Sequence, residues 1–296
     1  MNVRHGRLLV IVIGLVAFSL TLAQFRGVGE RTANTDVRVG GDACPVEYAD
    51  AEFFIEINAT DGDAGVQLML DGTGWNELEM TDPLDNVILE VSAADGPGGS
   101  VGVQGLTEFF FESAEPSFED QTLQELLDLF PEGDYEFVGL TTEGEEICGT
   151  AEFTHNIPAK PEPEVCVEDE DRVTICWDPV EEAFDDPNGA EVGDEIEIDM
   201  YRVVAEALDE EGEGLETLDI ELPADALCMS LPEEFVDLSP SEEFKFEVIA
   251  TEDSGNQTIH EGEFALEDVD ECDDEDSDSD DDSSDEDSDD DDSSDD

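Results

Sequence analysis

The chain has 296 residues, of which 86 are acidic and nine are basic, so its formal net charge is −77 at pH 7. Residues 273–296 hold 17 of the acids, which leaves 69 for the rest of the chain, so acidity belongs to the whole surface. Such a surface repels nucleic acid and anionic membranes, attracts cations, and repels itself unless salt screens it. The composition therefore excludes nucleic acid as a partner and indicates adaptation to salt, but it names no activity.

Residues 1–23 are predicted to form a secretory signal peptide. Arg4 and Arg7 precede an apolar run over residues 8–23, which ends in the small residue Ala23. This run is shorter than the roughly 20 apolar residues of a membrane span, so cleavage is expected, with an uncleaved anchor as the alternative. We expect a secreted or extracytoplasmic protein, in the periplasm or at the cell surface, with no membrane contact beyond the signal sequence. Residues 24–41 lack apolar periodicity and are predicted to be a flexible lead-in.

Residues 42–155 are predicted to form an antiparallel β-sandwich. Short runs of strand-forming residues alternate with turn signals such as DGTG at residues 71–74. The predicted strands cover residues 52–57, 66–70, 86–92, 135–141 and 146–155. One helix is expected over residues 118–130, capped by Ser117 and ended by Pro131, with a leucine stripe that packs on one end of the sheet.

Residues 156–164 (NIPAKPEPE) contain three prolines, which disfavour helix and interior strand. They are predicted to be a semi-rigid linker. A second strand-rich domain is expected over residues 165–272.

Residues 165–268 resemble a fibronectin type III domain. In VTICWDPV (173–180) alternation places Val173, Ile175 and Trp177 on one face, as in the family's second strand, and Tyr201 matches the third-strand aromatic. Residues 238–257 resemble the sixth strand, with Leu238, Pro240, Phe244, Phe246, Val248 and Ala250 at its alternating positions.

The resemblance departs from the family at Phe244, which stands where the corner tyrosine is usual. Phenylalanine keeps the packing but loses the hydroxyl hydrogen bond, so a less rigid corner is expected. The first domain resembles loosely the immunoglobulin-like modules that precede such domains in exported proteins. The predicted fold class is therefore all-β, with two tandem antiparallel β-sandwiches and a disordered acidic C-terminal tail.

Six cysteines in an exported chain predict three disulfides, for which fifteen pairings exist. Zinc binding is not expected, because no CxxC pair occurs and His155 and His260 are the only histidines after the signal peptide. The second and fifth strands are neighbours in the fibronectin type III topology, which implies a pairing of Cys176 with Cys228. The remaining cysteines lie at the ends of the two domains. A disulfide that joins the two ends of each domain then implies pairing of Cys166 with Cys272 and of Cys44 with Cys148.

Enzymatic sites are not predicted. Gly98–Gly102 spell GxSxG, but Ser100 follows turn residues and precedes no helical pattern, so a glycine-rich loop is the simpler interpretation. His155 could serve as a base, yet nothing links it to Ser100. Carboxylate pairs occur everywhere, so none indicates glycoside chemistry. No catalytic residue and no cofactor is assigned.

Calcium is the more serious candidate ligand. Acidic and amide side chains cluster in predicted turns, where their oxygens could converge, although none completes an EF-hand loop. Turn aspartates commonly bond their own backbone instead, which is the alternative. The weak metal candidates are Asp61, Asp63, Asp185 and Asp186, with Asp71, Asp82, Asp85 and Asn188 in similar turns.

The tail, residues 273–296, cannot bury enough apolar surface to fold. It is predicted to be disordered and either to bind divalent cations or to act as a solvating brush. The preferred functional reading is an exported, non-enzymatic interaction or adhesion module whose partner is an extracellular protein or matrix component. The alternative is a secreted calcium-binding or mineral-associated protein that acts through its acidic turns and tail.

Overall fold

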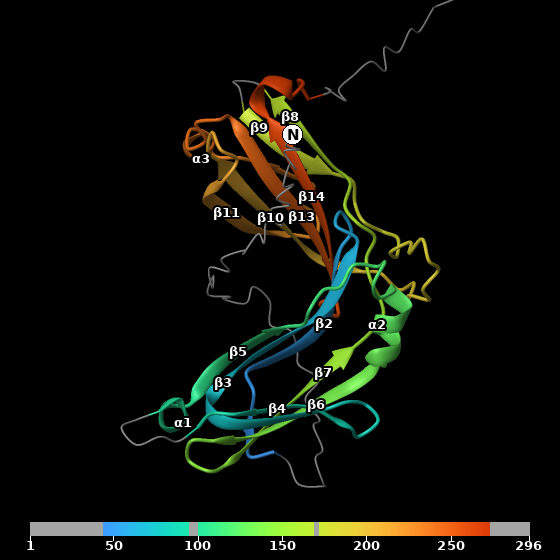
Figure 1. The fold of residues 1–296 in the computed structure, drawn as a ribbon, viewed down its shortest axis with the longest axis vertical. Coiled ribbons are helices and arrows are strands. Elements are labelled where there is room, and N and C mark those ends of the chain that lie inside the picture. The colour runs from blue at the N-terminus through green and yellow to red at the C-terminus, as the bar shows by residue number, and fades with distance from the viewer. Residues whose placement is uncertain (1–43, 95–99, 169–171, 273–296) are drawn as a thin grey trace, which may run out of the picture. The chain divides into compact units, whose positions relative to one another are not determined.

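The computed structural model of the chain describes residues 44–94, 100–168 and 172–272 (Figure 1). The predicted signal peptide, the lead-in, the acidic tail, Gly98 and Gly99 lie outside these residues. The described residues belong to one unit, Val37–Asp296. Within them, no helix is both long enough and apolar enough to span a membrane.

The first half of the chain consists mainly of strands. Four of its five predicted strands, at residues 52–57, 86–92, 135–141 and 146–155, lie close to observed ones, and the fifth, at residues 66–70, falls inside a longer strand. The elements are β1 (Val46–Glu47), β2 (Asp50–Asn58), β3 (Asp63–Thr81), β4 (Val87–Ser92), α1 (Val101–Gln104), β5 (Leu106–Glu112), α2 (Leu123–Leu129), β6 (Gly133–Thr141) and β7 (Glu146–Phe153). Strand β5 was not predicted.

The long strand β3 pairs with strands of both layers of the first sandwich. Its first part pairs with β2 and β5, and its last part, from Trp75, pairs with β4 and β6. The expected turn at residues 71–74 is wrong, because β3 continues through it with register shifts between Asp71 and Trp75. A side chain at Gly72 would meet the Tyr48 ring at 2.9 Å, so the glycine permits this close packing rather than a turn.

The predicted helix is shorter than expected and has a different cap. The Thr122 side chain accepts a hydrogen bond from the Glu125 backbone N–H, and the Glu125 side chain accepts one from the Thr122 N–H, which forms a capping box. Ser117 instead forms a β-bridge with Asp63. The leucine stripe does pack inward, since Leu123, Leu126 and Leu127 are buried in the first core.

The second half contains two sheets. Its elements are β8 (Pro163–Glu168), β9 (Arg172–Trp177), β10 (Ile198–Leu208), β11 (Gly214–Pro223), β12 (Cys228–Ser230), α3 (Glu233–Val236), β13 (Glu243–Glu252), β14 (Gln257–Ala265) and the 3-10 helix η1 (Leu266–Asp268). Strands β12, β9 and β8 form one sheet, while β14, β13, β10 and β11 lie side by side in the other. This is the arrangement that the fibronectin type III resemblance implies, and the all-β fold class is confirmed.

The core of this second sandwich follows the predicted alternation with two exceptions. Val173, Ile175 and Trp177 are buried against Tyr201, whose ring centroid lies 5.3 Å from that of Trp177. Leu238, however, is 47% exposed and Pro240 is exposed as well, whereas Phe235 of α3 is buried in the core. The short helix before the sixth strand turns Leu238 outward, which the alternating pattern could not show.

Two serines make hydrogen bonds to backbone near Phe244, which stands where the family's corner tyrosine is usual. Ser239 and Ser241 hydroxyls both donate to the Leu208 carbonyl oxygen, at 2.9 and 3.0 Å. A tyrosine that bonds backbone four residues upstream occurs in the first sandwich instead, where Tyr135 Oη donates to the Pro131 carbonyl oxygen at 3.0 Å.

The predicted linker is partly embedded in structure. Ile157 is fully buried in the first core, and Pro163 already begins β8. The loop between β9 and β10 also reaches the first core, where Phe184 and Val192 pack. The domain boundary at residues 156–164 therefore stays a prediction.

Candidate functional site

The two sandwiches are joined by a parallel pairing of three residues each from β2 and β14. Asn256, which is 1% exposed, directly precedes the paired residues of β14 and stabilises the beginning of this pairing. The Asn256 side chain accepts a hydrogen bond from the Ile55 backbone N–H at 2.7 Å and donates to the carbonyl oxygens of Thr154 and Asn156 at 3.0 and 2.8 Å. One amide side chain thus connects three segments of the chain, and its bond to Ile55 is buried away from competing water.

Carboxyl groups gather beside this pairing in a set that we call the junction carboxyl cluster. Gln257 Nε2 donates a hydrogen bond to the Glu56 carboxylate, and the Glu56 and Glu115 side chains hydrogen-bond to each other. A carboxyl pair of this kind needs one shared proton, because two charged carboxylates would repel. The members of the cluster are Glu56, Asp63, Glu112, Glu115 and Glu247.

Burial is the main cause of the unusual protonation in this cluster. Desolvation, with the nearby Glu112 and Glu247 charges, raises the pKa of Glu56 to about 7. Desolvation, with the charges of Glu56, Glu112 and Asp63, raises the pKa of Glu115 to about 8. Burial beside Glu261 likewise raises the pKa of Glu247 to about 7. The Glu56–Glu115 pair therefore retains a proton near neutral pH.

Sequence reasoning missed this cluster, and no sequence signal could have found it. Glu56 and Glu115 are 59 positions apart, and each looks like any other acid in the chain. The pairing depends on residues 113–117 turning back over β3, where a side chain at Gly65 would meet Glu115 Cγ at 2.8 Å.

The predicted calcium ligands are brought together only in part. A hollow of about 470 Å³ is lined by Asp61, Gly62, Ser117, Phe118, Glu119 and Asn188, so Asp61 and Asn188 line the same hollow. Asp186 is buried elsewhere in the same loop, where its Oδ2 accepts a hydrogen bond from the Ala190 N–H at 2.9 Å. Asp185 is exposed, and Asp63 belongs to the junction carboxyl cluster.

Local hydrogen bonds account for other turn aspartates. Asp82 accepts bonds from the backbone N–H groups of Leu84 and Asn86 at 2.9 and 2.7 Å, which is typical of a turn. In the described part of the chain, the one group of three cysteine, histidine or acidic ligand atoms within 4.8 Å is Cys44, Glu146 and Cys148, whose cysteines are already joined in a disulfide. The calcium assignment thus stays a prediction.

The GxSxG serine does not meet a base. Ser100 precedes the one-turn helix α1, a helix that the sequence analysis did not predict. Its hydroxyl is buried without a hydrogen-bond partner among the described residues. His155 Nε2 donates to the Phe130 carbonyl oxygen at 2.8 Å, and its ring packs on Phe153.

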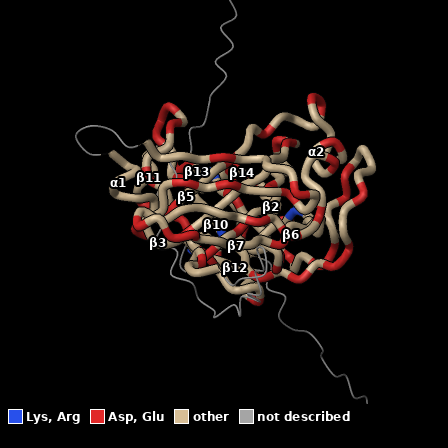
Figure 2. Tube along the Cα trace, turned by 90° about the horizontal axis from the view of Figure 1, so that it is seen from below, with Lys and Arg blue, Asp and Glu red and all other residues tan. Residues whose placement is uncertain are grey.

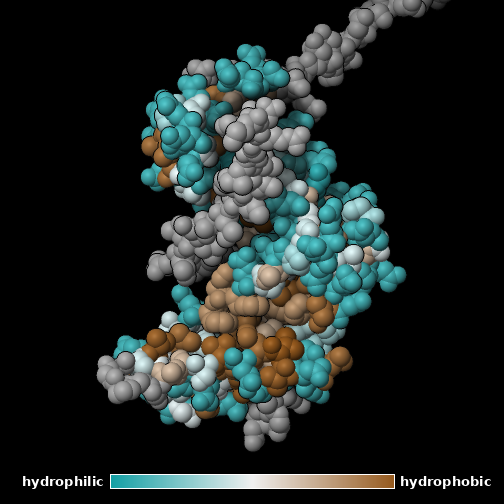
Figure 3. All heavy atoms as spheres, in the orientation of Figure 1, coloured by the Kyte–Doolittle hydropathy of each residue, from teal (hydrophilic) through white to brown (hydrophobic). Residues whose placement is uncertain are grey.

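The first sandwich leaves part of its core only partly covered, at the inward side chains of β4 and β5. Within the described residues, β4 and β5 each pair with β3 alone. Their inward side chains are packed against the first core but are only partly buried; we call Leu89, Val91, Phe109 and Phe111 the apolar opening. Figure 3 shows apolar side chains gathered over the part of the molecule that holds β2 to β7, while most other surface is hydrophilic.

Around this opening the charge is of one sign. Residues 44–155 contain 27 acidic residues and no lysine or arginine. Figure 2 shows acidic residues throughout the described part of the trace and very few basic ones. An apolar area framed by acids is unusual on a chain that is otherwise so strongly solvated.

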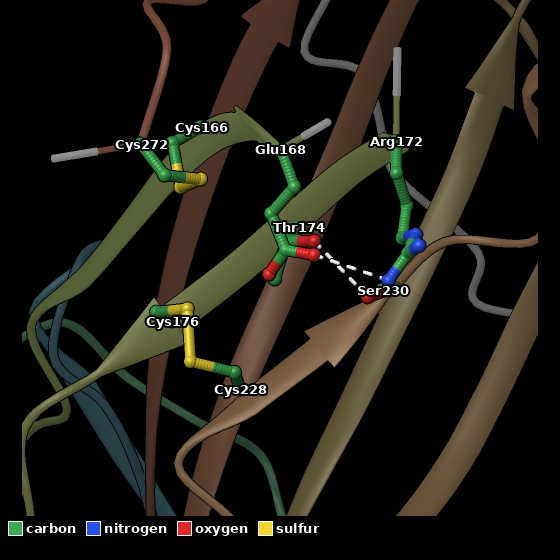
Figure 4. The surroundings of a disulfide bond; sticks show 8 residues. All are labelled: Cys166, Glu168, Arg172, Thr174, Cys176, Cys228, Ser230 and Cys272. Carbon is green, nitrogen blue, oxygen red and sulfur yellow. Dashed lines mark hydrogen bonds and ion pairs between the residues drawn. A yellow bond between two sulfur atoms is a disulfide. The ribbon is translucent and has the colours of Figure 1, made fainter. Parts of the chain in front are cut away.

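Three disulfides close the two sandwiches. They join Cys44 to Cys148, Cys166 to Cys272 and Cys176 to Cys228, which are the pairs that the resemblance implied. Figure 4 shows the last of these linking β9 to β12, beside the hydrogen bond between the Thr174 and Ser230 hydroxyls at 3.0 Å.

Comparison with known proteins gives structural likeness alone. No family model matches the chain, and no curated protein matches it. Similar solved structures include the FN1–FN3 domains of chicken CNTN1 (10% identity, 74% of this chain and 64% of that chain, TM-score 0.34) and a two-domain fibronectin type III segment of chicken tenascin (12%, 75% and 98%, TM-score 0.26). A tetra-tandem repeat from the extending region of a large adhesion protein is also similar (10%, 73% and 49%, TM-score 0.24).

The chain thus spans less than two thirds of the CNTN1 segment and about half of the adhesion-protein segment. The fold assignment rests on the strand order and registers of this chain, whose second sandwich has the fibronectin type III arrangement.

Proposed function

We propose that this protein is an exported, non-enzymatic interaction module that works at or outside the cell surface. The observation that carries the proposal is the apolar opening between β4 and β5, since exposed apolar areas of this kind mark interaction sites. The disulfides suit an oxidising compartment, and the β2–β14 pairing with Asn256 holds the second sandwich to the first.

The experiment is adhesion of coated beads. Beads that carry residues 24–296 are expected to adhere to cells or matrix of the source organism, and adhesion should be lost after the disulfides are reduced. Beads coated with residues 24–272 separate the sandwiches from the acidic tail. Adhesion no greater than that of beads carrying an unrelated protein of similar negative charge would refute the proposed function.

A calcium-dependent role is the second candidate, favoured by the hollow that Asp61, Glu119 and Asn188 line. Calcium chloride below 1 mM should then raise the unfolding midpoint more than sodium chloride at matched ionic strength, and Asp61→Asn should abolish the difference. Equal stabilisation by both salts would remove this candidate.

A further inference from the structure

Among the residues that the structure describes, strand β5 pairs only with β3, so its other backbone edge has no strand partner there, and its side chains form a two-sided pattern. Phe109 and Phe111 point to the core side of the sheet, whereas Glu108, Phe110 and Glu112 lie on the other face. Phe110 is 39% exposed, and both glutamates are exposed. A strand added to this edge would hydrogen-bond its backbone groups and would cover the two inward rings.

Charge decides what kind of strand fits. A second copy of this chain would bring another sandwich without lysine or arginine against the first, so the two surfaces would repel. An anionic lipid surface or a nucleic acid is repelled for the same reason. Neighbouring side chains on adjacent strands lie within about 5 Å of each other, so residues beside Glu108 and Glu112 should be basic.

We propose that the β5 edge, Leu106–Glu112, binds an extended segment of a cationic partner protein in which apolar and basic residues alternate. The apolar side chains enter the apolar opening beside Phe109 and Phe111, and the basic side chains pair with Glu108 and Glu112. This inference rests on the proposed function and names the partner chemistry of the same site.

The test uses the mature chain, residues 24–296, and a nine-residue peptide of alternating lysine and valine. The peptide should bind at low salt and protect the amides of Leu106–Glu112 from hydrogen exchange. The double variant Glu108→Lys with Glu112→Lys should weaken binding about tenfold, because it reverses the paired charges on an exposed face. The matched control, Glu210→Lys with Glu211→Lys in the exposed β10–β11 turn, carries the same change in net charge and should weaken binding less than about twofold.

Several results would overturn the inference. Equal weakening by both double variants would reduce it to general charge attraction, and equal binding of a glutamate–valine peptide would remove the charge argument. A dimeric mature chain with β5 already protected would show that a second copy occupies the edge. Stronger peptide binding after removal of residues 24–43 would show that the chain's own lead-in occupies the β5 edge.

The two proposals fail separately. Bead adhesion without peptide binding at β5 would leave the interaction role standing and refute this site. Peptide binding at β5 without bead adhesion would refute the interaction role and leave the edge as a peptide-binding strand.

Discussion

The Glu56–Glu115 pair predicts a dependence of stability on pH that one substitution should remove. An unfolded glutamate loses its proton near its ordinary pKa of 4.5, whereas Glu56 in the folded chain keeps its proton until about pH 7. The folded state therefore binds more protons than the unfolded state between these values. The sign follows: this stabilising contribution is complete below pH 4.5 and is lost as pH rises through about 7.

The magnitude comes from the shift of Glu56 alone. A rise from 4.5 to about 7 corresponds to about 3 kcal/mol, since one unit of pKa is worth about 1.4 kcal/mol. Glu115 is not added, because it shares the same proton and is more exposed to solvent, which screens its charge. We expect the free energy of unfolding of the wild type to fall by about 2 to 3 kcal/mol more than that of Glu56→Gln between pH 5 and pH 8.

Urea unfolding of the mature chain at constant salt, repeated across this pH range, measures the difference. Glu143→Gln is the control, because it removes one negative charge from an exposed turn and should leave the wild-type slope unchanged. Parallel curves for the wild type and Glu56→Gln would show that the pair holds no extra proton, and the account of the junction carboxyl cluster would be wrong.

Three further outcomes are expected. Asn256→Ala should lower the free energy of unfolding by about 2 to 3 kcal/mol in urea titrations, because it strands the buried backbone groups that the amide satisfies, whereas exposed Asn188→Ala should change it by less than about 0.5 kcal/mol. Tyr135→Phe should cost about 1 kcal/mol in thermal unfolding through loss of its bond to backbone, and an unchanged midpoint would contradict a structural role for the hydroxyl. Peptide mapping without reductant should recover Cys176 linked to Cys228, and either cysteine found with another partner would contradict the pairing of β9 with β12.

Local patterns predicted the inward face of strand β9 because its large apolar residues stand two positions apart. The burial of Val173, Ile175 and Trp177 could be read from their spacing alone. The prediction failed at Leu238, where a one-turn helix shifts the phase of the pattern. It failed again at residues 71–74, where glycines that permit close packing look the same as glycines that make a turn.

The junction could not be predicted from local patterns at all. Asn256 contacts Ile55 across 201 positions of sequence, and the turn signal around Gly255 gives no hint of that partner. The same limit applies to the junction carboxyl cluster, because in a chain with 86 acids no spacing distinguishes the few that become buried. The edges of β4 and β5 could not be predicted for a related reason. A strand pattern shows which face of the strand is apolar, but it does not show whether a neighbouring strand pairs with its edge.

The positions of two disulfides have a mechanical consequence. If the chain is pulled at residues 44 and 272, tension crosses from Cys44 to Cys148, follows residues 148–166, and crosses from Cys166 to Cys272. Both sandwiches lie almost wholly outside this covalent route, so stretching can straighten about 60 Å of backbone instead of the roughly 780 Å between those residues in an uncrosslinked chain. Under oxidising conditions the protein would act as a short tether of nearly fixed length, and reduction would turn it into a long extensible one.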